Sequence, residues 1–277
     1  MRPLCVACAL FVIFLVVGCT HTFFQPERAL IQTPERAGLR YEIVRLLAAD
    51  GVELFTWFLP ARGTPKATVL FLHGNAENIS THFMNVAWMP AEGFNVLALE
   101  YRGYGSSDGT PSLAGVQLDI DAALETLLER PGVERRRIVL FGQSLGGALA
   151  IHYAARGKQR DALRAVIADS AFADYRAIVK EKLAGFFLTW PFQWLPVLTV
   201  DNDYSPLASV RAVSPLPLLL IHGESDAIVP AHHSKRLYEA AAQPKELWLL
   251  PTAGHIQSVR DPALRRRLSE FVLRAVQ

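Results

Sequence analysis

The chain reads RIVLFGQSLGG at residues 137–147, and this stretch decides the fold. Its apolar, β-branched first half favours a strand that is covered on both faces, and a helical pattern follows over residues 148–156. Between them, two glycines flank a serine in the order Gly142-Gln143-Ser144-Leu145-Gly146. This is the pattern of a nucleophile elbow, a tight strand-to-helix turn in which side chains at positions 142 and 146 would collide. The helix that follows aims backbone N–H groups at a developing anion, so Ser144 is the predicted nucleophile.

A nucleophilic serine needs a base, and the base needs a group that orients it. The chain reads HGESDAIVP at residues 222–230, after one strand-like run, and PTAGH at residues 251–255, after the last such run. We predict His255 as the base, because it alone ends the final strand in a glycine-preceded loop. We predict Asp226, in the earlier of the two loops, as the acid.

Two other carboxylates compete with Asp226 for the role of acid. Glu224 lies in the same loop, and Asp169 ends an earlier strand. A capping or buried polar role fits Asp169 equally well, which favours Asp226.

The tetrahedral intermediate of acyl transfer needs N–H donors for its oxyanion. One predicted donor is the backbone N–H of Leu145, the residue after the nucleophile. The second is the backbone N–H of Asn75, in the loop HGNAEN at residues 73–78 that follows an early strand. An ordinary Gly-Asn turn is the alternative interpretation of that loop.

Around the elbow, short apolar runs alternate with helical patterns. Because the central runs are apolar throughout, they predict a mostly parallel sheet of about eight strands with helices on both faces, which is the α/β class. A hairpin is expected between the first two strands, and a helix is expected to begin after an N-cap at Asp261. The predicted strands are 40–47, 52–59, 67–72, 94–99, 137–142, 164–169, 216–222 and 245–250.

Composition excludes several classes of function. The 277 residues are 51% hydrophobic and 19% charged, which suits one globular domain with a sizeable core. A net charge of +2 without a lysine and arginine cluster argues against a nucleic-acid partner. No group of histidines or cysteines has the spacing of metal ligands, and neither a metal nor a cofactor is predicted.

The first residues resemble an export signal. Arg2 is followed by a charge-free run from Leu4 to Val17, which is short for a membrane span, and residues 16–19 read VVGC. This ending resembles the bacterial lipobox, which implies a signal peptide over residues 1–18 and a lipid on Cys19. An uncleaved anchor helix is the alternative.

The same resemblance predicts a place for the protein. Residues 19–38 are interpreted as a tether between the membrane and a domain at residues 39–277, in the bacterial cell envelope. Thr20 rather than aspartate follows the cysteine, which favours the outer membrane over the inner one.

Over about residues 40–277 the sequence resembles the α/β-hydrolase superfamily. Three motifs carry the resemblance, and they are similar to those of bacterial esterases and eukaryotic protein depalmitoylases: HGNAENIS at residues 73–80, YRGYGSS at 101–107 and GQSLGG at 142–147. The chain order of serine, aspartate and histidine is also the order of that fold. In relatives an aspartate often precedes the second motif, where this chain has Glu100.

The resemblance implies a serine hydrolase that cleaves small-molecule esters through an acyl-enzyme. An acyl-thioesterase or a serine peptidase with the same triad remains an alternative, as does an inactive binding module of the envelope.

The substrate specificity is expected to reside in a cap over about residues 172–207. Residues 183–200 carry no charge, yet Pro191 and Pro196 would break a membrane-spanning helix there. In the α/β-hydrolases, insertions at this place form a cap, and its aromatic side chains could hold acyl or aromatic groups. The predicted substrate contacts are Tyr101, Phe186, Trp190 and Trp194. Two other hypotheses are that the cap residues complete the core, or that they face outward and rest on a bilayer.

Overall fold

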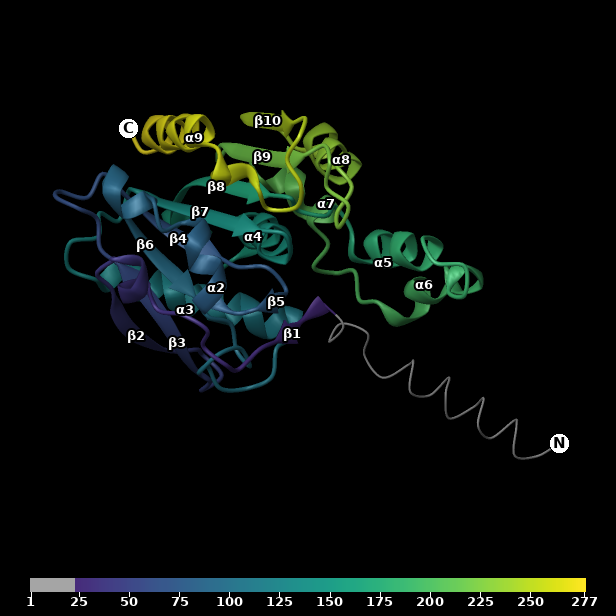
Figure 1. Ribbon diagram of the computed structural model, residues 1–277, viewed down its shortest axis with the longest axis horizontal. Helices are drawn as coiled ribbons and strands as arrows, with labels where there is room; N and C mark the ends of the chain where they lie inside the picture. Colours follow the sequence, from purple (N-terminus) through teal and green to yellow (C-terminus); the bar gives the residue numbers. More distant parts are fainter. Residues whose placement is uncertain (1–22) are drawn as a thin grey trace.

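The computed structural model describes residues 23–277, which form an eight-stranded sheet with helices on both faces (Figure 1). The predicted signal peptide over residues 1–18 and the predicted lipid attachment at Cys19 lie outside the described residues. The strand order is β10-β9-β8-β7-β4-β6-β3-β2. The strands are β2 (Glu42–Leu47), β3 (Glu53–Leu59), β4 (Ala67–Leu72), β6 (Phe94–Leu99), β7 (Ile138–Gln143), β8 (Leu163–Asp169), β9 (Leu218–Gly223) and β10 (Lys245–Leu250).

Most neighbouring strands of this sheet are parallel. The predicted hairpin joins β2 and β3 as an antiparallel pair, and β3 is also antiparallel to β6. The remaining pairs, from β6 through β4, β7, β8 and β9 to β10, are all parallel. The predicted fold class is therefore confirmed: an α/β fold with a mostly parallel sheet.

The central strands are apolar along their whole length because both faces of the sheet are covered. Side chains of a strand alternate between the two faces. In β4, Leu70 and Leu72 join the core cluster that lies under α3 and α4, whereas Val69 and Phe71 join the cluster under α9. The two clusters hold the sheet between two helical layers.

Two of the long helices begin at a residue whose side chain caps the first turn. The side chain of Ser112 caps α3 by accepting the N–H of Gly115 at 3.0 Å, and that of Asp261 caps α9 by accepting the N–H of Ala263 at 2.8 Å. The α-helices are α2 (Ile79–His82), α3 (Leu113–Glu129), α4 (Leu145–Arg156), α5 (Tyr175–Ala184), α6 (Leu195–Thr199), α7 (Pro206–Ser209), α8 (His232–Ala240) and α9 (Pro262–Ala275). Short 3₁₀ turns lie at Pro34–Ala37, Phe83–Asn85, Met89–Glu92, Arg160–Ala162, Trp190–Phe192, Val210–Val213 and Ser258–Arg260.

The segment between β8 and β9 forms a cap, residues 174–209, which comprises α5, α6 and α7. It extends from the ends of the strands at one side of the molecule (Figure 1). Pro191 lies in the 3₁₀ turn and Pro196 in the first turn of α6, so the charge-free stretch is divided into short elements. Within residues 23–277, no helix combines the length and the apolar character needed to cross a bilayer.

The first described residues dock onto the domain, which corrects one prediction. Residues 19–38 were expected to form a tether, but in their described part Phe23 and Phe24 are buried, and β1 (Gln25–Pro26) pairs with β5 (Ala76–Glu77). The side-chain amide of Asn78 donates to the carbonyl oxygens of Glu27 and Ala29 at 3.0 and 2.8 Å. We call residues 23–31 the N-terminal strap.

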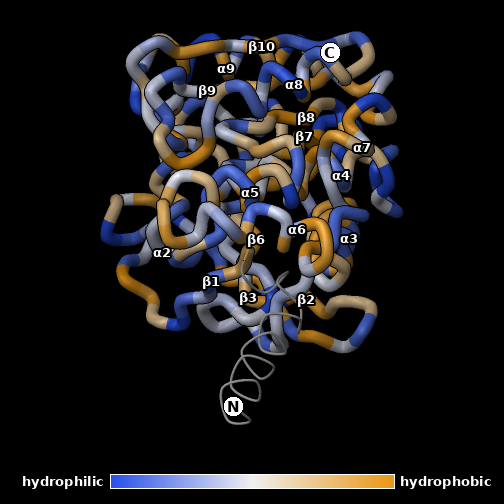
Figure 2. Tube along the Cα trace, turned by 90° about the vertical axis from the view of Figure 1, so that its right-hand side faces the viewer, coloured by the Kyte–Doolittle hydropathy of each residue, from blue (hydrophilic) through white to orange (hydrophobic). Residues whose placement is uncertain are grey.

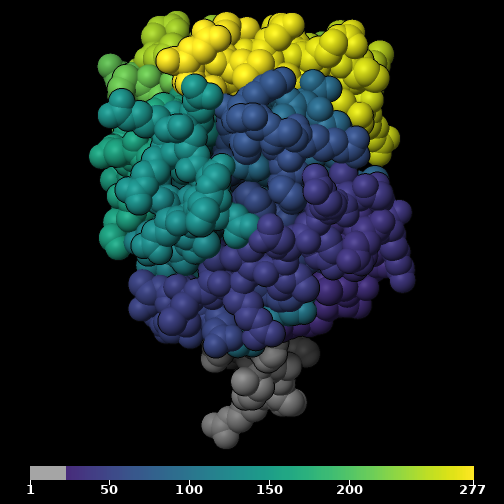
Figure 3. Space-filling model, turned by 90° about the vertical axis from the view of Figure 1, so that its left-hand side faces the viewer, coloured from purple at the N-terminus to yellow at the C-terminus, as the bar shows by residue number. Residues whose placement is uncertain are grey.

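The side of the molecule away from the cap holds the amino-terminal ends of the parallel strands (Figure 1). Figure 3 shows this side, with the N-terminal part of the described chain in purple and blue, the C-terminal part in yellow at the top and part of the middle of the chain in teal at the left. The predicted site residues instead gather at the cap side, at the carboxyl ends of the parallel strands.

Candidate active site

Three side chains from three separate loops meet in one hydrogen-bonded chain. Ser144 follows β7, Asp226 follows β9 and His255 follows β10, and the carboxyl ends of parallel strands share one edge of the sheet. Nε2 of His255 lies 2.9 Å from Oγ of Ser144, and Nδ1 of His255 lies 2.7 Å from Oδ2 of Asp226. The structure thus brings together the predicted nucleophile, base and acid.

The turn that carries Ser144 is strained in the way the sequence pattern requires. Ser144 has φ 54° and ψ −116°, a left-handed conformation that side chains rarely adopt. A Cβ at Gly142 would lie 2.1 Å from the carbonyl oxygen of Gly146, and a Cβ at Gly146 would lie 2.2 Å from that of Leu72. Only glycine fits at either position, and α4 begins directly after the serine, at Leu145.

Asp226 is held as a carboxylate. Its Oδ1 accepts the backbone N–H groups of Ile228 and Val229, each at 2.8 Å. Burial by itself raises the pKa of this carboxyl, but hydrogen bonds from His222, His255 and the Val229 N–H outweigh it, so the pKa lies well below its usual range. The carboxylate is therefore charged and fixed beside the imidazole.

The rival carboxylates have other roles. Asp169 is buried and accepts hydrogen bonds from Gln143 Nε2 at 2.9 Å, Ser258 Oγ at 2.6 Å and Ser170 Oγ at 3.1 Å. It joins the elbow to the loop that follows His255, and burial raises its pKa in spite of these hydrogen bonds. Glu224 is exposed and lies 3.8 Å from Nζ of Lys235.

The loop after β4 places the second predicted oxyanion donor. Nδ1 of His73 lies 2.7 Å from the carbonyl oxygen of Gly74, and the peptide unit of that carbonyl carries the N–H of Asn75. In a trans peptide the N–H points away from the C=O, so the hydrogen bond from His73 fixes the direction of the donor. The carbonyl of Asn75 is held in turn by the N–H of Gln25, at 2.9 Å, and by the hydroxyl of Tyr104.

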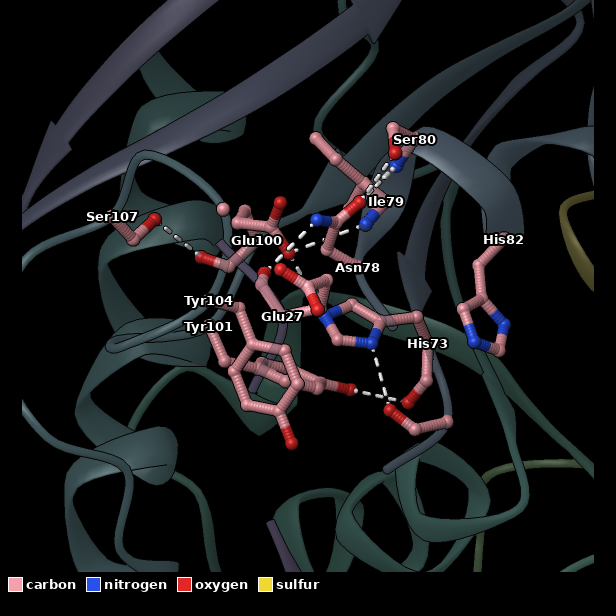
Figure 4. A network of polar contacts seen from close by, with 12 residues as sticks. Glu27, His73, Asn78, Ile79, Ser80, His82, Glu100, Tyr101, Tyr104 and Ser107 are labelled. Atoms are coloured by element: carbon pink, nitrogen blue, oxygen red, sulfur yellow. Dashed lines mark hydrogen bonds and ion pairs between the residues drawn. The ribbon is translucent and has the colours of Figure 1, made fainter. Parts of the chain in front are cut away.

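Behind this loop, His73 and Glu100 form a buried pair, shown in Figure 4. Nε2 of His73 lies 3.2 Å from Oε1 of Glu100, although the two are not aligned as a hydrogen bond, and Oε1 also accepts the N–H of Ile79 at 3.3 Å. Burial lowers the pKa of His73 to about 3 and raises that of Glu100 well above its usual range. Burial thus favours the uncharged form of both groups.

A cavity of about 400 Å³ opens above Ser144. Three parts of the molecule enclose it: the edge of the sheet that carries Ser144, Asp226 and His255, which we call the triad edge, the N-terminal strap, and helix α5 of the cap. Apart from one lysine its walls are uncharged and mostly apolar, which is typical of a small-molecule site. The lining residues are Phe23, Gln25, Asn75, Ser144, Leu145, Phe172, Ile178, Val179, Lys182, Leu183, Ile228 and Val229.

Both predicted oxyanion donors line the cavity, but the four predicted substrate contacts do not, and that prediction is wrong. Tyr101 is wholly buried, and its hydroxyl donates to the carbonyl of His73 at 3.0 Å. Phe186, Trp190 and Trp194 are 51%, 61% and 57% exposed. They follow α5, whose inner face, and not the aromatic stretch after it, closes the cavity.

Sequence reasoning missed two walls of the cavity, the N-terminal strap and the inner face of α5. The adjacent aromatics Phe23 and Phe24, within the expected tether at residues 19–38, were the signal for the strap. The apolar spacing of Ile178, Val179 and Leu183 was the signal for the inner face of α5.

A group with the composition of a metal site lies between the cap and α8. Ligand atoms of Glu181, His232 and His233 lie within 4.8 Å of one another. However, Nδ1 of His233 accepts the N–H of Ala173 at 3.1 Å, so in the neutral ring the hydrogen is on Nε2, which donates to Glu181 at 3.1 Å. A ligating histidine has the reverse arrangement, and the group is better suited to tying α5 to α8.

Comparisons with known proteins agree with this architecture. Residues 63–214 match the protein family described as serine aminopeptidase, S33. The chain is 37% identical to the protein YfhR of Escherichia coli K12, over 96% of this chain and 94% of that protein. It is 33% identical to the protein bem46 of Schizosaccharomyces pombe, over 75% of this chain and 68% of that one.

Among solved structures, the chain is similar to the Pyrococcus furiosus esterase Pf2001. In one crystal form the identity is 25% and the TM-score 0.71, covering 90% of this chain and 99% of the esterase. The α/β hydrolase GrgF of Penicillium has the same fold, with a TM-score of 0.71 at 20% identity, over 86% of this chain and 99% of its own.

Proposed function

The chain belongs to the serine aminopeptidase S33 family of α/β-hydrolases, and from that premise we propose that it is a serine hydrolase that cleaves carboxylic esters through an acyl-enzyme. One observation carries the proposal. Ser144, His255 and Asp226 form a continuous hydrogen-bonded chain, at 2.9 and 2.7 Å, at the floor of a largely apolar cavity.

The mechanism uses each of these groups in turn. Nε2 of His255 takes the proton of Ser144 as Oγ attacks the ester carbonyl, while Asp226 holds Nδ1–H of the ring and stabilises the imidazolium. The N–H groups of Leu145 and Asn75 bind the oxyanion, and each lowers the barrier by about 3 kcal/mol. The imidazolium protonates the departing alkoxide. His255 then activates a water that releases the acid and restores Ser144.

The cavity favours esters of apolar acids over aminoacyl substrates. Phe23, Ile178 and Leu183 offer apolar surface to an acyl chain, and each buried methylene contributes about 0.8 kcal/mol. An aminopeptidase site needs an acceptor for the α-amino group of its substrate, usually a carboxylate. No carboxylate lines the cavity among the residues that the structure describes. Acyl-thioesters meet the same apolar wall and the same triad, and they are the second candidate substrate.

A graded substrate panel tests the proposal. Wild-type protein is expected to hydrolyse p-nitrophenyl esters and to be labelled at Ser144 by a fluorophosphonate, whereas aminoacyl p-nitroanilides remain intact. Ser144→Ala is expected to abolish turnover and labelling while the thermal transition is unchanged. Ser269→Ala is the matched control, because that buried hydroxyl has no hydrogen-bond partner in the structure and lies outside the cavity. Full activity of Ser144→Ala, or an unlabelled wild type, would refute the proposal and favour an inactive binding module.

We further propose that the protein is a lipoprotein of the bacterial cell envelope, with a signal peptide over residues 1–18 and a lipid on Cys19. The sequence pattern VVGC at residues 16–19 supports this. Metabolic labelling with an alkyne fatty acid tests it: the mature wild type should be labelled, and Cys19→Ser should be neither labelled nor processed. Labelling retained by Cys19→Ser, or a chain that keeps residues 1–18, would contradict it.

A further inference from the structure

The cap exposes apolar side chains that the fold does not need. Among the described residues, fourteen large hydrophobic side chains are exposed, and eight of these lie between residues 186 and 198. We call these eight the cap patch: Phe186, Phe187, Leu188, Trp190, Phe192, Trp194, Val197 and Leu198. In Figure 2, which looks at this side of the molecule, the tube at α6 has the colour of hydrophobic residues.

The cap patch is also free of charge. Residues 183–200 include no lysine, arginine, aspartate or glutamate. Soluble monomers rarely expose a contiguous apolar surface of this kind, and such a surface marks a contact with a partner or a membrane. Phe187 and Leu198 are 76% and 74% exposed, so most of their surface is available to that partner.

The route of the chain indicates which partner it is. Phe23 packs against Phe172 and Tyr175 at the start of α5, with ring centroids 6.0 and 4.8 Å apart. The chain therefore enters the domain at the base of the cap, and Cys19, the proposed site of the lipid, lies four residues before Phe23 in the sequence. β1 and α6 lie toward the same end of the molecule in Figure 1. The point at which the proposed lipid anchor joins the domain and the exposed apolar surface of the cap thus lie on one side of the domain.

We propose that the cap patch docks onto a lipid bilayer and that the cavity receives its substrate from that bilayer. Aromatic and aliphatic side chains of this kind insert into the boundary between lipid headgroups and acyl chains. Helix α5 connects the two places, because Ile178, Val179 and Leu183 line the cavity and the patch begins at Phe186. An acyl chain leaving the bilayer meets apolar surface from the patch to Ser144. The docking stands by itself, whereas the delivery of a bilayer-borne ester or thioester rests on the proposed function.

The tryptophans of the chain allow docking to be measured without any activity. The chain has five, of which Trp57 and Trp248 are buried and Trp88 is half-buried, while Trp190 and Trp194 belong to the patch. The full-length protein is reconstituted into phosphatidylcholine vesicles with brominated acyl chains, which quench only tryptophans in contact with them. We expect strong quenching of the wild type and its loss in the double variant Trp190→Phe with Trp194→Phe.

The other outcomes overturn the proposal. Wild-type protein that is bound to the vesicles but not quenched would be anchored with its cap away from the lipid. Patch tryptophans shielded from both the brominated lipid and aqueous acrylamide, in a protein that cross-links as a dimer, would mean that a second copy covers the patch.

The delivery of substrate from the bilayer is tested by introducing charged side chains into the cap patch. Phe187→Glu with Leu198→Glu is expected to abolish the quenching and to lower hydrolysis of a long-chain ester held in vesicles roughly tenfold or more, because the carboxylates resist insertion. Turnover of a short water-soluble ester should not change, because neither residue lines the cavity. Ile43→Glu with Leu47→Glu, two exposed apolar residues on β2, is the matched control. If the patch variant lost quenching but kept its rate on the vesicle ester, docking would stand and delivery would be wrong; if no ester were cleaved at all, the proposed function would fail while the quenching result remained valid.

Discussion

The triad edge and the cap enclose the same cavity, but their side chains are held in opposite ways. At the edge, the polar groups of Asp226 and Asp169 have several hydrogen-bond partners each, and the backbone of Ser144 is locked in a rare conformation. In the cap, α5 presents an apolar inner face to the cavity, and the segment after it leaves eight large side chains exposed.

This difference suggests that the triad edge determines the rate of the reaction and that the cap determines which substrates are preferred. A reacting oxygen misplaced by 1 Å can cost 10²-fold in rate, so the groups that act on it must be held from several directions. Apolar contacts lack direction, and a wall made of them tolerates substrates that differ in length. Substitutions at the edge should therefore change rates greatly, and those in the cap should change preferences moderately.

The largest expected effect distinguishes the two buried aspartates of the edge. Asp226→Asn should lower kcat by about 10⁴-fold, because the amide neither stabilises the imidazolium nor fixes its tautomer. Asp169→Asn should lower kcat far less but reduce the free energy of unfolding by about 1–3 kcal/mol, since Ser258 and Ser170 donate to different oxygens of Asp169 and the amide keeps only one of them. Ester kinetics and urea denaturation of both variants measure this; a larger loss of kcat in Asp169→Asn would exchange their roles.

Acid should unfold the protein through its buried histidines. Burial lowers the pKa of four of them from 6.5, to about 3 for one and about 4 for three, so below pH 6.5 the unfolded chain binds protons that the folded chain does not. Stability is thus full above pH 6.5 and is lost as the pH falls through 4. Glu100, Asp119 and Asp169, whose pKa values burial raises, oppose this trend but are fewer. The four histidines are His73, His82, His152 and His233.

His152 offers the variant that tests this slope. Its Nδ1 has no hydrogen-bond partner, and it lies outside the cavity. In urea titrations between pH 7 and 4, the free energy of unfolding of His152→Gln should fall less steeply with pH than that of the wild type. The difference in slope should correspond to the uptake of about one proton on unfolding. An unchanged slope would exclude His152 from the effect.

A pair of leucines compares the inner and outer surfaces of the cap. Leu183→Ala should lower kcat/KM for medium-chain soluble esters about tenfold, because a buried leucine contributes about 1.5–3 kcal/mol of apolar contact. Leu198→Ala should leave this value unchanged, since Leu198 does not line the cavity. Equal losses in the two variants would show that the cap repacks around the substrate.

The smallest effect is expected at Glu100, where burial disfavours the charged form of the carboxyl. Glu100→Gln should change the free energy of unfolding by less than about 1 kcal/mol, because burial favours the neutral carboxyl and the amide keeps its shape. Glu100→Ala should cost about 1–3 kcal/mol, since the N–H of Ile79 loses its acceptor. A strongly destabilised Glu100→Gln would indicate an ionised carboxylate beside His73.

The sequence predicted the sheet well because strand boundaries are local. Every predicted strand lies within two residues of an observed one, and the turn at 142–146 can hold only glycine at its two ends. The convergence of Ser144, Asp226 and His255 followed from one rule, that loops after parallel strands share an edge.

The docking of the N-terminal strap and the outward direction of the aromatic side chains of the cap could not be predicted in this way. Two-residue pairing at Gln25–Pro26 leaves no periodicity, so a docked segment resembles a free one in sequence. Aromatic content gives the apolar area of residues 186–194 but not its direction, which depends on how α5 packs against the sheet. The contact of Glu181 with His233 joins residues far apart in the chain, and no local pattern reports it.

The burial of Phe23 matters for how the molecule is handled. An affinity tag fused directly before this residue would emerge at the mouth of the cavity, where it would compete with substrate and with any surface that the cap contacts. Gln277 is exposed at the end of α9, on the side away from the cap (Figure 1). Handles for purification or immobilisation therefore belong at the carboxyl terminus, where they leave the entrance clear.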